Sequence, residues 1–123
     1  MRPKREWTDY LRDILTHAEK AEQFVAGVEF ETFRANDEKV FAVIRALEIV
    51  GEAARQIPSD LRTRYPEIPW EDAIGMRDKL MHDYFGVDLE VVWRTVRDDL
   101  PPLRSAVARM LDDLEAGPDA ADK

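Results

Sequence analysis

Apolar residues recur every three or four positions through most of the chain, the spacing that gives an α-helix one apolar face. The first such stretch predicts a helix over residues 9–26, with Thr8 as its N-cap and Gly27 as its stop. Its apolar positions are Tyr10, Ile14, Leu15, Ala18, Ala21 and Val25. We therefore expect this helix to bury one side.

A second amphipathic stretch predicts a long helix over residues 38–56, capped by Asn36 or Asp37. Its apolar stripe is wide enough for a helix at the centre of a bundle. The stripe consists of Val40, Val43, Ile44, Leu47, Val50 and Ala54. We expect only a short turn, containing Phe30 and Phe33, between the two helices.

The second half of the chain continues this pattern with prolines and glycines at the boundaries. A short helical turn is predicted over residues 59–64. A third long helix is expected to begin near Trp70 and to end at Tyr84 or Phe85, with Gly86 as a C-cap candidate.

Asp88 is expected to cap a fourth helix, and Pro101 and Pro102 predict a break or kink. A final helix would then run to about Leu114. No stretch has the alternation of a β-strand. The pattern predicts an all-α, up-and-down antiparallel helical bundle with short connections.

Length and composition narrow the picture further. A chain of 123 residues suggests one domain, which we place at residues 9–115, after an N-terminal lead (1–8) and before a flexible acidic tail (116–123). The chain lacks cysteine and any apolar run of about 20 residues, so we expect a cytoplasmic protein without a membrane span. The net charge of −8 argues against a general nucleic-acid coat protein but allows a local basic site.

The candidate chemistry lies in Arg77-x4-His82-x-Tyr84, in a chain with only two histidines. These residues bring together a fixed cation suited to phosphate oxygens, a side chain type that titrates near neutral pH, and a phenol. They suit the cleavage of an RNA phosphodiester, because RNA supplies its own 2′-hydroxyl nucleophile. Neither a metal nor a cofactor is then needed.

Helical geometry separates Arg77 from His82 by roughly 140° around the axis. Two arrangements remain open: the Arg77 side chain wraps around the helix, or two copies of the chain form a composite site across a twofold axis. Asp78 lies one turn before His82 and could hydrogen-bond its ring. Tyr84 shares a face with Arg77 and could bind phosphate or stack on a base.

The same residues also have ordinary structural interpretations. Asp78 and His82 could form a plain surface pair, and Tyr84 could sit at the edge of the core. Glu52 is either a solvated helix residue or a polar member of the site. Gly51, just before it, predicts close packing against another helix, because glycine inside a helix costs about 1 kcal/mol relative to alanine.

Several segments resemble the HEPN superfamily, specifically the HepT-like toxins of the HepT/MNT toxin–antitoxin systems, over roughly residues 9–114. They occur in the family's order: Tyr10-Leu-Arg-Asp-Ile-Leu15, Ala46-Leu-Glu-Ile-Val-Gly-Glu-Ala53, Ile68-Pro-Trp70, Gly75-Met-Arg-Asp-Lys-Leu-Met-His-Asp-Tyr-Phe85, Val92-Trp-Arg-Thr-Val96 and Asp99-Leu-Pro101.

The resemblance implies a homodimer whose two motifs face a shared cleft. It also implies a metal-independent endoribonuclease toxin of a type VII-like toxin–antitoxin pair. Arg77 and His82 match the family's catalytic pair. Tyr84 matches the tyrosine that the partner nucleotidyltransferase antitoxin (MNT type) modifies with AMP, which would place negative charge where RNA phosphate binds. Asp78 departs from the asparagine common in the wider superfamily.

Some HEPN proteins lack nuclease activity. The alternative is therefore a non-catalytic helical module that binds nucleotide or serves as an interaction partner of a nucleotidyltransferase.

Overall fold

The computed structural model describes residues 6–82 and 86–116, and all regular secondary structure in this part of the chain is helical. Its α-helices, with one π-helical segment, η2, are α1 (Trp7–Val25), α2 (Phe30–Ala35), α3 (Asp37–Gln56), α4 (Ser59–Thr63), α5 (Trp70–His82), α6 (Leu89–Arg94), η2 (Thr95–Asp99) and α7 (Leu100–Glu115). The prediction of an all-α fold is confirmed. Most of the predicted N-terminal lead and acidic tail, and the predicted end of the third long helix, lie outside the described residues.

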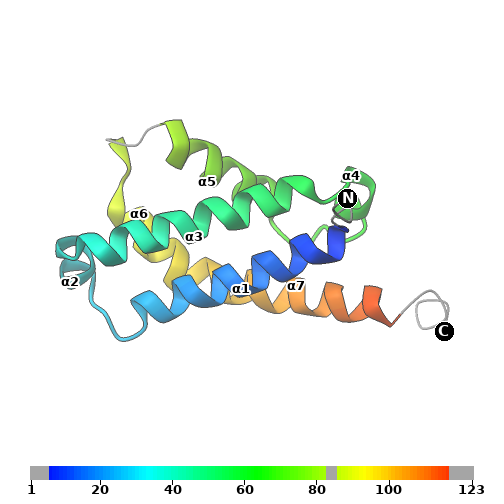
Figure 1. Cartoon of the computed structure of the whole chain (residues 1–123), viewed down its shortest axis with the longest axis horizontal. Helices are drawn as coiled ribbons and strands as arrows, with labels where there is room; N and C mark the ends of the chain where they lie inside the picture. Colours follow the sequence, from blue (N-terminus) through cyan, green and yellow to red (C-terminus); the bar gives the residue numbers. More distant parts are fainter. Residues whose placement is uncertain (1–5, 83–85, 117–123) are drawn as a thin grey trace, which may run out of the picture.

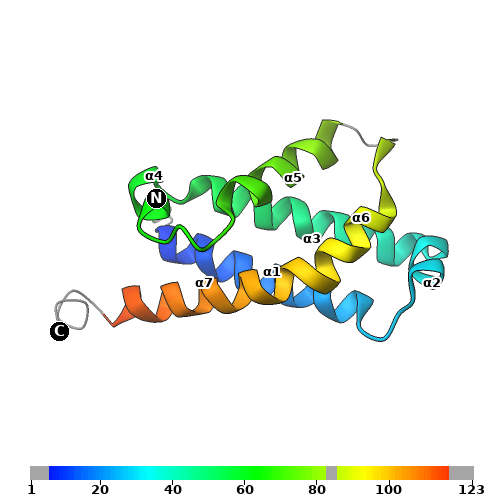
Figure 2. The ribbon, with the colours of Figure 1, turned by 180° about the vertical axis from the view of Figure 1, so that it is seen from behind.

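The long helices form an up-and-down arrangement in which neighbours run in opposite directions (Figure 1). Helix α3 lies between α1 and α5, and α7 packs against the other side of α1. Figure 2, from behind, shows α6 leading into α7. The position of α3 agrees with the wide apolar stripe that predicted a central helix.

The core is built mainly from aliphatic side chains, with Phe33 and Trp70 as its large aromatic members, and it contains no buried polar or charged residue among the described residues. Helix α1 buries one face, formed by Leu11, Ile14, Ala18, Ala21 and Val25. The core positions of α3 are Val43, Ala46, Leu47, Val50, Ala53 and Ala54. Four of the six predicted stripe residues of this helix are therefore buried, and Val40 and Ile44 are partly buried against the core.

Several predicted boundaries are confirmed by local geometry. Gly27 has a φ of +69°, the left-handed conformation that stops α1. The Asn36 side chain accepts a hydrogen bond from the Lys39 N–H at 3.1 Å, and Asp88 accepts from the Glu90 N–H at 3.0 Å. These bonds satisfy N–H groups that have no partner inside the helix.

Other boundaries differ from prediction. Thr8 is not the N-cap of α1: the helix begins at Trp7, where the Glu6 N–H donates to the Asp9 carboxylate at 3.1 Å. The expected turn containing Phe30 is instead the short helix α2, because Phe33 is fully buried on its inner face.

The prolines at 101 and 102 do not break the chain's helical course. Helix α6 continues through η2 into α7, and the Leu100 N–H donates to the Thr95 carbonyl five residues earlier. Pro101 and Pro102 have no N–H to donate to the preceding turn. The wider π turn accommodates them in the first turn of α7. The chain is therefore not broken there, and the final helix begins at the prolines, as predicted.

Candidate functional site

The candidate site forms where α3 and α5 approach each other most closely. A Cβ placed on Gly51 would lie 2.2 Å from the Arg77 Cβ and 2.7 Å from the Ala73 carbonyl oxygen. Only glycine therefore fits at this crossing. The close packing predicted at Gly51 is confirmed, and its consequence is that the base of Arg77 rests on the α3 backbone.

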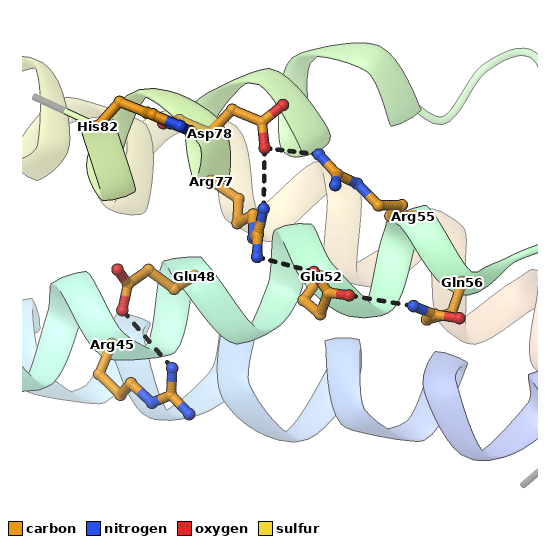
Figure 3. Close-up of polar contacts among 8 residues, drawn as sticks. All are labelled: Arg45, Glu48, Glu52, Arg55, Gln56, Arg77, Asp78 and His82. Atoms are coloured by element: carbon orange, nitrogen blue, oxygen red, sulfur yellow. Dashed lines mark hydrogen bonds and ion pairs between the residues drawn. The ribbon is translucent and has the colours of Figure 1, made fainter.

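Arg77 points from α5 toward α3 (Figure 3). Its guanidinium lies 3.2 Å from the Glu52 carboxylate and donates a hydrogen bond to the Asp78 carboxylate at 3.0 Å. The side chain is only 20% exposed, so Arg77 is held in place while part of it stays accessible. Glu52 is both partly solvated, at 44% exposed, and paired with Arg77, and its membership of the functional site stays a prediction.

The Glu52 side chain is held in place by a neighbour on its own helix, α3. One carboxylate oxygen accepts a hydrogen bond from the Gln56 side chain at 3.0 Å. The other faces Arg77 and is buried without a hydrogen bond, so the contact is an ion pair rather than a well-directed hydrogen bond. A buried carboxylate oxygen facing a guanidinium sets the position of the cation through charge.

The Asp78 carboxylate has two cationic partners. Its Oδ1 accepts hydrogen bonds from Arg77 and, at 2.5 Å, from Arg55 on α3. The hydrogen bond from Arg77, followed by the charge of Arg55, lowers the pKa of Asp78 from its ordinary value of 3.8. The carboxylate is therefore ionised at neutral pH and is shared between two helices.

His82 is oriented by Asp78, but not as predicted. The expected partner was the Asp78 carboxylate, whereas the His82 Nδ1 lies 2.7 Å from the Asp78 backbone carbonyl. A carbonyl can only accept, so Nδ1 carries the hydrogen and Nε2 is the basic nitrogen of the neutral ring. The Asp78 carboxylate instead contacts Arg55 and Arg77 through its Oδ1.

Arg77 and His82 point in different directions from α5. Figure 3 shows Arg77 directed at α3 and His82 at the end of α5, with its ring turned toward Asp78. This agrees with the angular separation predicted from the sequence, and the Arg77 side chain does not wrap around the helix to His82. Tyr84 lies outside the described residues.

The sequence interpretation missed Arg55. It stands 23 positions before Asp78, and only the packing of α3 on α5 joins them. One signal was present in the sequence: Arg55 follows Gly51 by one helical turn on the helix that the glycine brings close to α5.

The described residues contain neither a metal-binding cluster nor a membrane-spanning helix. No group of three or more His, Cys, Asp or Glu side chains is arranged to hold a metal ion there. None of the helices in those residues is long and apolar enough to cross a membrane.

The fold and the site define an all-α protein in which α5 carries two notable side chains. One is an arginine that is ion-paired against α3, and the other is a histidine whose ring is oriented by a backbone carbonyl. Comparison with known proteins gives the family. Residues 14–110 match the family described as Ribonuclease HepT-like, and the chain belongs to this family.

The chain also matches several named relatives over most of its length. The chain is 48% identical to "Probable ribonuclease HepT" of Thermococcus cleftensis over 87% of this chain and 97% of that protein. It is 42% identical to a "Putative RNase" of Methanocaldococcus jannaschii, over 92% of this chain and 97% of that one. A "Putative RNase" of Caldanaerobacter subterraneus is 38% identical, over 83% and 91%. No solved structure matches the chain.

Proposed function

We propose that this protein is a metal-independent endoribonuclease in which Arg77 binds the RNA phosphate and His82 transfers a proton. The observation that supports this proposal most is the orientation of His82, whose Nδ1 lies against the Asp78 carbonyl and whose Nε2 is left as the basic nitrogen, on the same helix as Arg77. Membership of the HepT-like ribonuclease family supports the same activity.

The proposed reaction is a transesterification within the RNA. The 2′-hydroxyl loses its proton to a base, its oxygen forms a new bond to phosphorus, and the bond from phosphorus to the 5′-oxygen breaks. The leaving 5′-oxygen takes up a proton, which gives a 2′,3′-cyclic phosphate and a 5′-hydroxyl. Arg77 would stabilise the charge on the phosphate oxygens during this step.

A homodimer accounts for the divergent directions of Arg77 and His82. Two copies of α5 facing each other across a twofold axis would allow Arg77 of one copy to work beside His82 of the other. Each composite site would then hold one Arg77 and one His82, with His82 moving one proton of the reaction and water the other.

A growth-arresting toxin paired with an MNT-type nucleotidyltransferase antitoxin, acting in the cytoplasm, follows from the family resemblance. Tyr84 is the proposed AMP acceptor. A phosphodiester adduct on this tyrosine, seven positions after Arg77 in the sequence, would add bulk and negative charge near the phosphate that Arg77 binds. The alternative, a non-catalytic module that binds a nucleotidyltransferase, is favoured by the full pairing of Arg77 with Glu52 and Asp78.

Two RNA substrates, one with free 2′-hydroxyl groups and one with methylated 2′-oxygens, distinguish the ribonuclease from the non-catalytic module. We expect the purified protein, with a metal chelator present, to cleave an RNA strand and to leave intact the same strand carrying 2′-O-methyl groups. The products should carry 2′,3′-cyclic phosphate ends by mass spectrometry. Intact RNA under these conditions, from protein free of AMP, would favour the non-catalytic module.

A further inference from the structure

Two arginines from different helices contact a single oxygen atom at the site. Arg55 on α3 and Arg77 on α5 both donate to Asp78 Oδ1, at 2.5 and 3.0 Å. The Arg55 and Asp78 side chains are 43% and 41% exposed, so solvent and solutes reach this contact. The Asp78 carboxylate therefore occupies an open position between two guanidinium groups.

The contribution of this arrangement to stability is small. Two like charges drawn to one atom repel each other, and exposed ion pairs contribute only about 0–1 kcal/mol. Glu52 already supplies Arg77 with one carboxylate, at 3.2 Å. Asp78 then provides a second negative charge on the other side of that cation, and it brings Arg55 to the site as well.

A phosphodiester matches what the two arginines hold. It carries one negative charge on two oxygens, as the Asp78 carboxylate does, and guanidinium groups bind phosphate oxygens through directed, charge-assisted hydrogen bonds. A backbone phosphate of RNA could replace the carboxylate between Arg55 and Arg77 without changing the charge that the arginines see.

We propose that Arg55 is a second phosphate-binding residue of the site, and that Asp78 occupies the phosphate position between Arg55 and Arg77 until RNA displaces it. The inference rests on the proposed function. It adds Arg55 as a residue that binds RNA, and Asp78 as a carboxylate that competes with RNA phosphate for the two arginines. Figure 3 shows Arg55 on the side of Arg77 away from His82. Arg55 would thus bind substrate without taking part in proton transfer.

The test is a binding measurement with RNA that cannot be cleaved. The probe is a fluorescent 2′-O-methyl RNA oligonucleotide, and its anisotropy is followed with the full chain at several salt concentrations. Arg55→Gln should weaken binding at least about fivefold and lower the salt slope by about one. Asp78→Asn should tighten binding several-fold, because it removes the competing charge at nearly constant shape.

The double variant separates phosphate binding from a purely structural role. If Arg55 contacts RNA, Arg55→Gln still weakens binding when residue 78 is already asparagine. If Arg55 only holds the Asp78 carboxylate, Arg55→Gln has no effect in that background, and the proposal is overturned. Arg34→Gln is the matched control, since Arg34 is also an exposed arginine paired with a carboxylate, Glu31, but lies on α2.

These measurements are independent of catalysis. Failure to cleave ordinary RNA would overturn the proposed nuclease function and leave the Arg55 result standing. Conversely, cleavage by Arg55→Gln with an unchanged KM would overturn the role of Arg55 alone. A raised KM with an unchanged kcat is the expected result. Absence of any RNA binding by the unsubstituted protein would also overturn the inference.

Discussion

Gly51 of α3 and Arg77 of α5 lie so close that a methyl group on residue 51 would stand 2.2 Å from the Arg77 Cβ. The neighbouring atoms include the Ala73 backbone carbonyl, which cannot move aside as a flexible side chain end could. The separation of these two helices, and with it the position of the arginine, therefore depends on glycine at 51.

Gly51→Ala should accordingly destabilise the protein. Overpacking a fixed contact costs about 1–3 kcal/mol or more, and the gain in helix propensity offsets only about 1 kcal/mol of this. We expect a net loss on the order of 1–2 kcal/mol in urea unfolding, together with reduced RNA cleavage from the displaced Arg77. Gly75→Ala on α5 is the control, because an added Cβ there meets open space. It should stabilise by up to about 1 kcal/mol. Equal effects from the two substitutions would contradict the close crossing.

Asp78 should make part of the protein's stability dependent on acid pH. Hydrogen bonding to Arg77, with the charge and hydrogen bond of Arg55, lowers the folded-state pKa of Asp78 below 3.8. A lowered carboxyl pKa contributes stability above the unfolded value, and this contribution is lost as the pH falls through the folded one. Between about pH 5 and pH 2, unfolding measurements should show a larger loss for the unsubstituted protein than for Asp78→Asn. The same loss in both proteins would mean that the ion pairs with Arg55 and Arg77 do not persist in solution.

A composite site predicts complementation between two inactive variants. Arg77→Ala and His82→Ala, mixed after partial denaturation and refolded together, should form mixed dimers in which one site has both residues intact. RNA cleavage should return in the mixture. A mixture of Arg77→Ala with the Arg77→Ala/His82→Ala double variant is the control and should stay inactive. No recovery in mixed dimers verified by native mass spectrometry would contradict a site shared between copies.

Modification of Tyr84 should silence the protein. Incubation with its partner nucleotidyltransferase and ATP should transfer AMP to the phenol oxygen, release pyrophosphate, and raise the mass by one or more AMP units. Tyr84→Phe should prevent the increase, and Tyr65→Phe should not. An increase that persists in Tyr84→Phe would assign the acceptor elsewhere.

Periodicity in the sequence predicted the helices well, because each long helix buries a stripe whose spacing follows the helical repeat. At Pro101 and Pro102 it predicted a break or kink and the start of the final helix. That start is confirmed, whereas a wider π turn keeps the chain helical from α6 to α7 without a break. Within the site, the sequence predicted the helix that carries Arg77 and the separate direction of His82. Local spacing suggested that Asp78 pairs with His82, whereas the approach of α3 gives that carboxylate to Arg55. A tertiary contact of this kind leaves no periodic trace in the sequence.

The central claim is that His82 transfers the proton in RNA cleavage, and a comparison of the two histidines tests it most directly. His17 holds its ring as His82 does, with Nδ1 at 2.8 Å from the Asp13 carbonyl, but on α1. RNA cleavage should be measured for unmodified, correctly folded His82→Ala and His17→Ala proteins in the presence of a chelator. We predict a loss of at least about 100-fold for His82→Ala and near-normal activity for His17→Ala. Equal cleavage by His82→Ala and the unsubstituted protein would contradict the account.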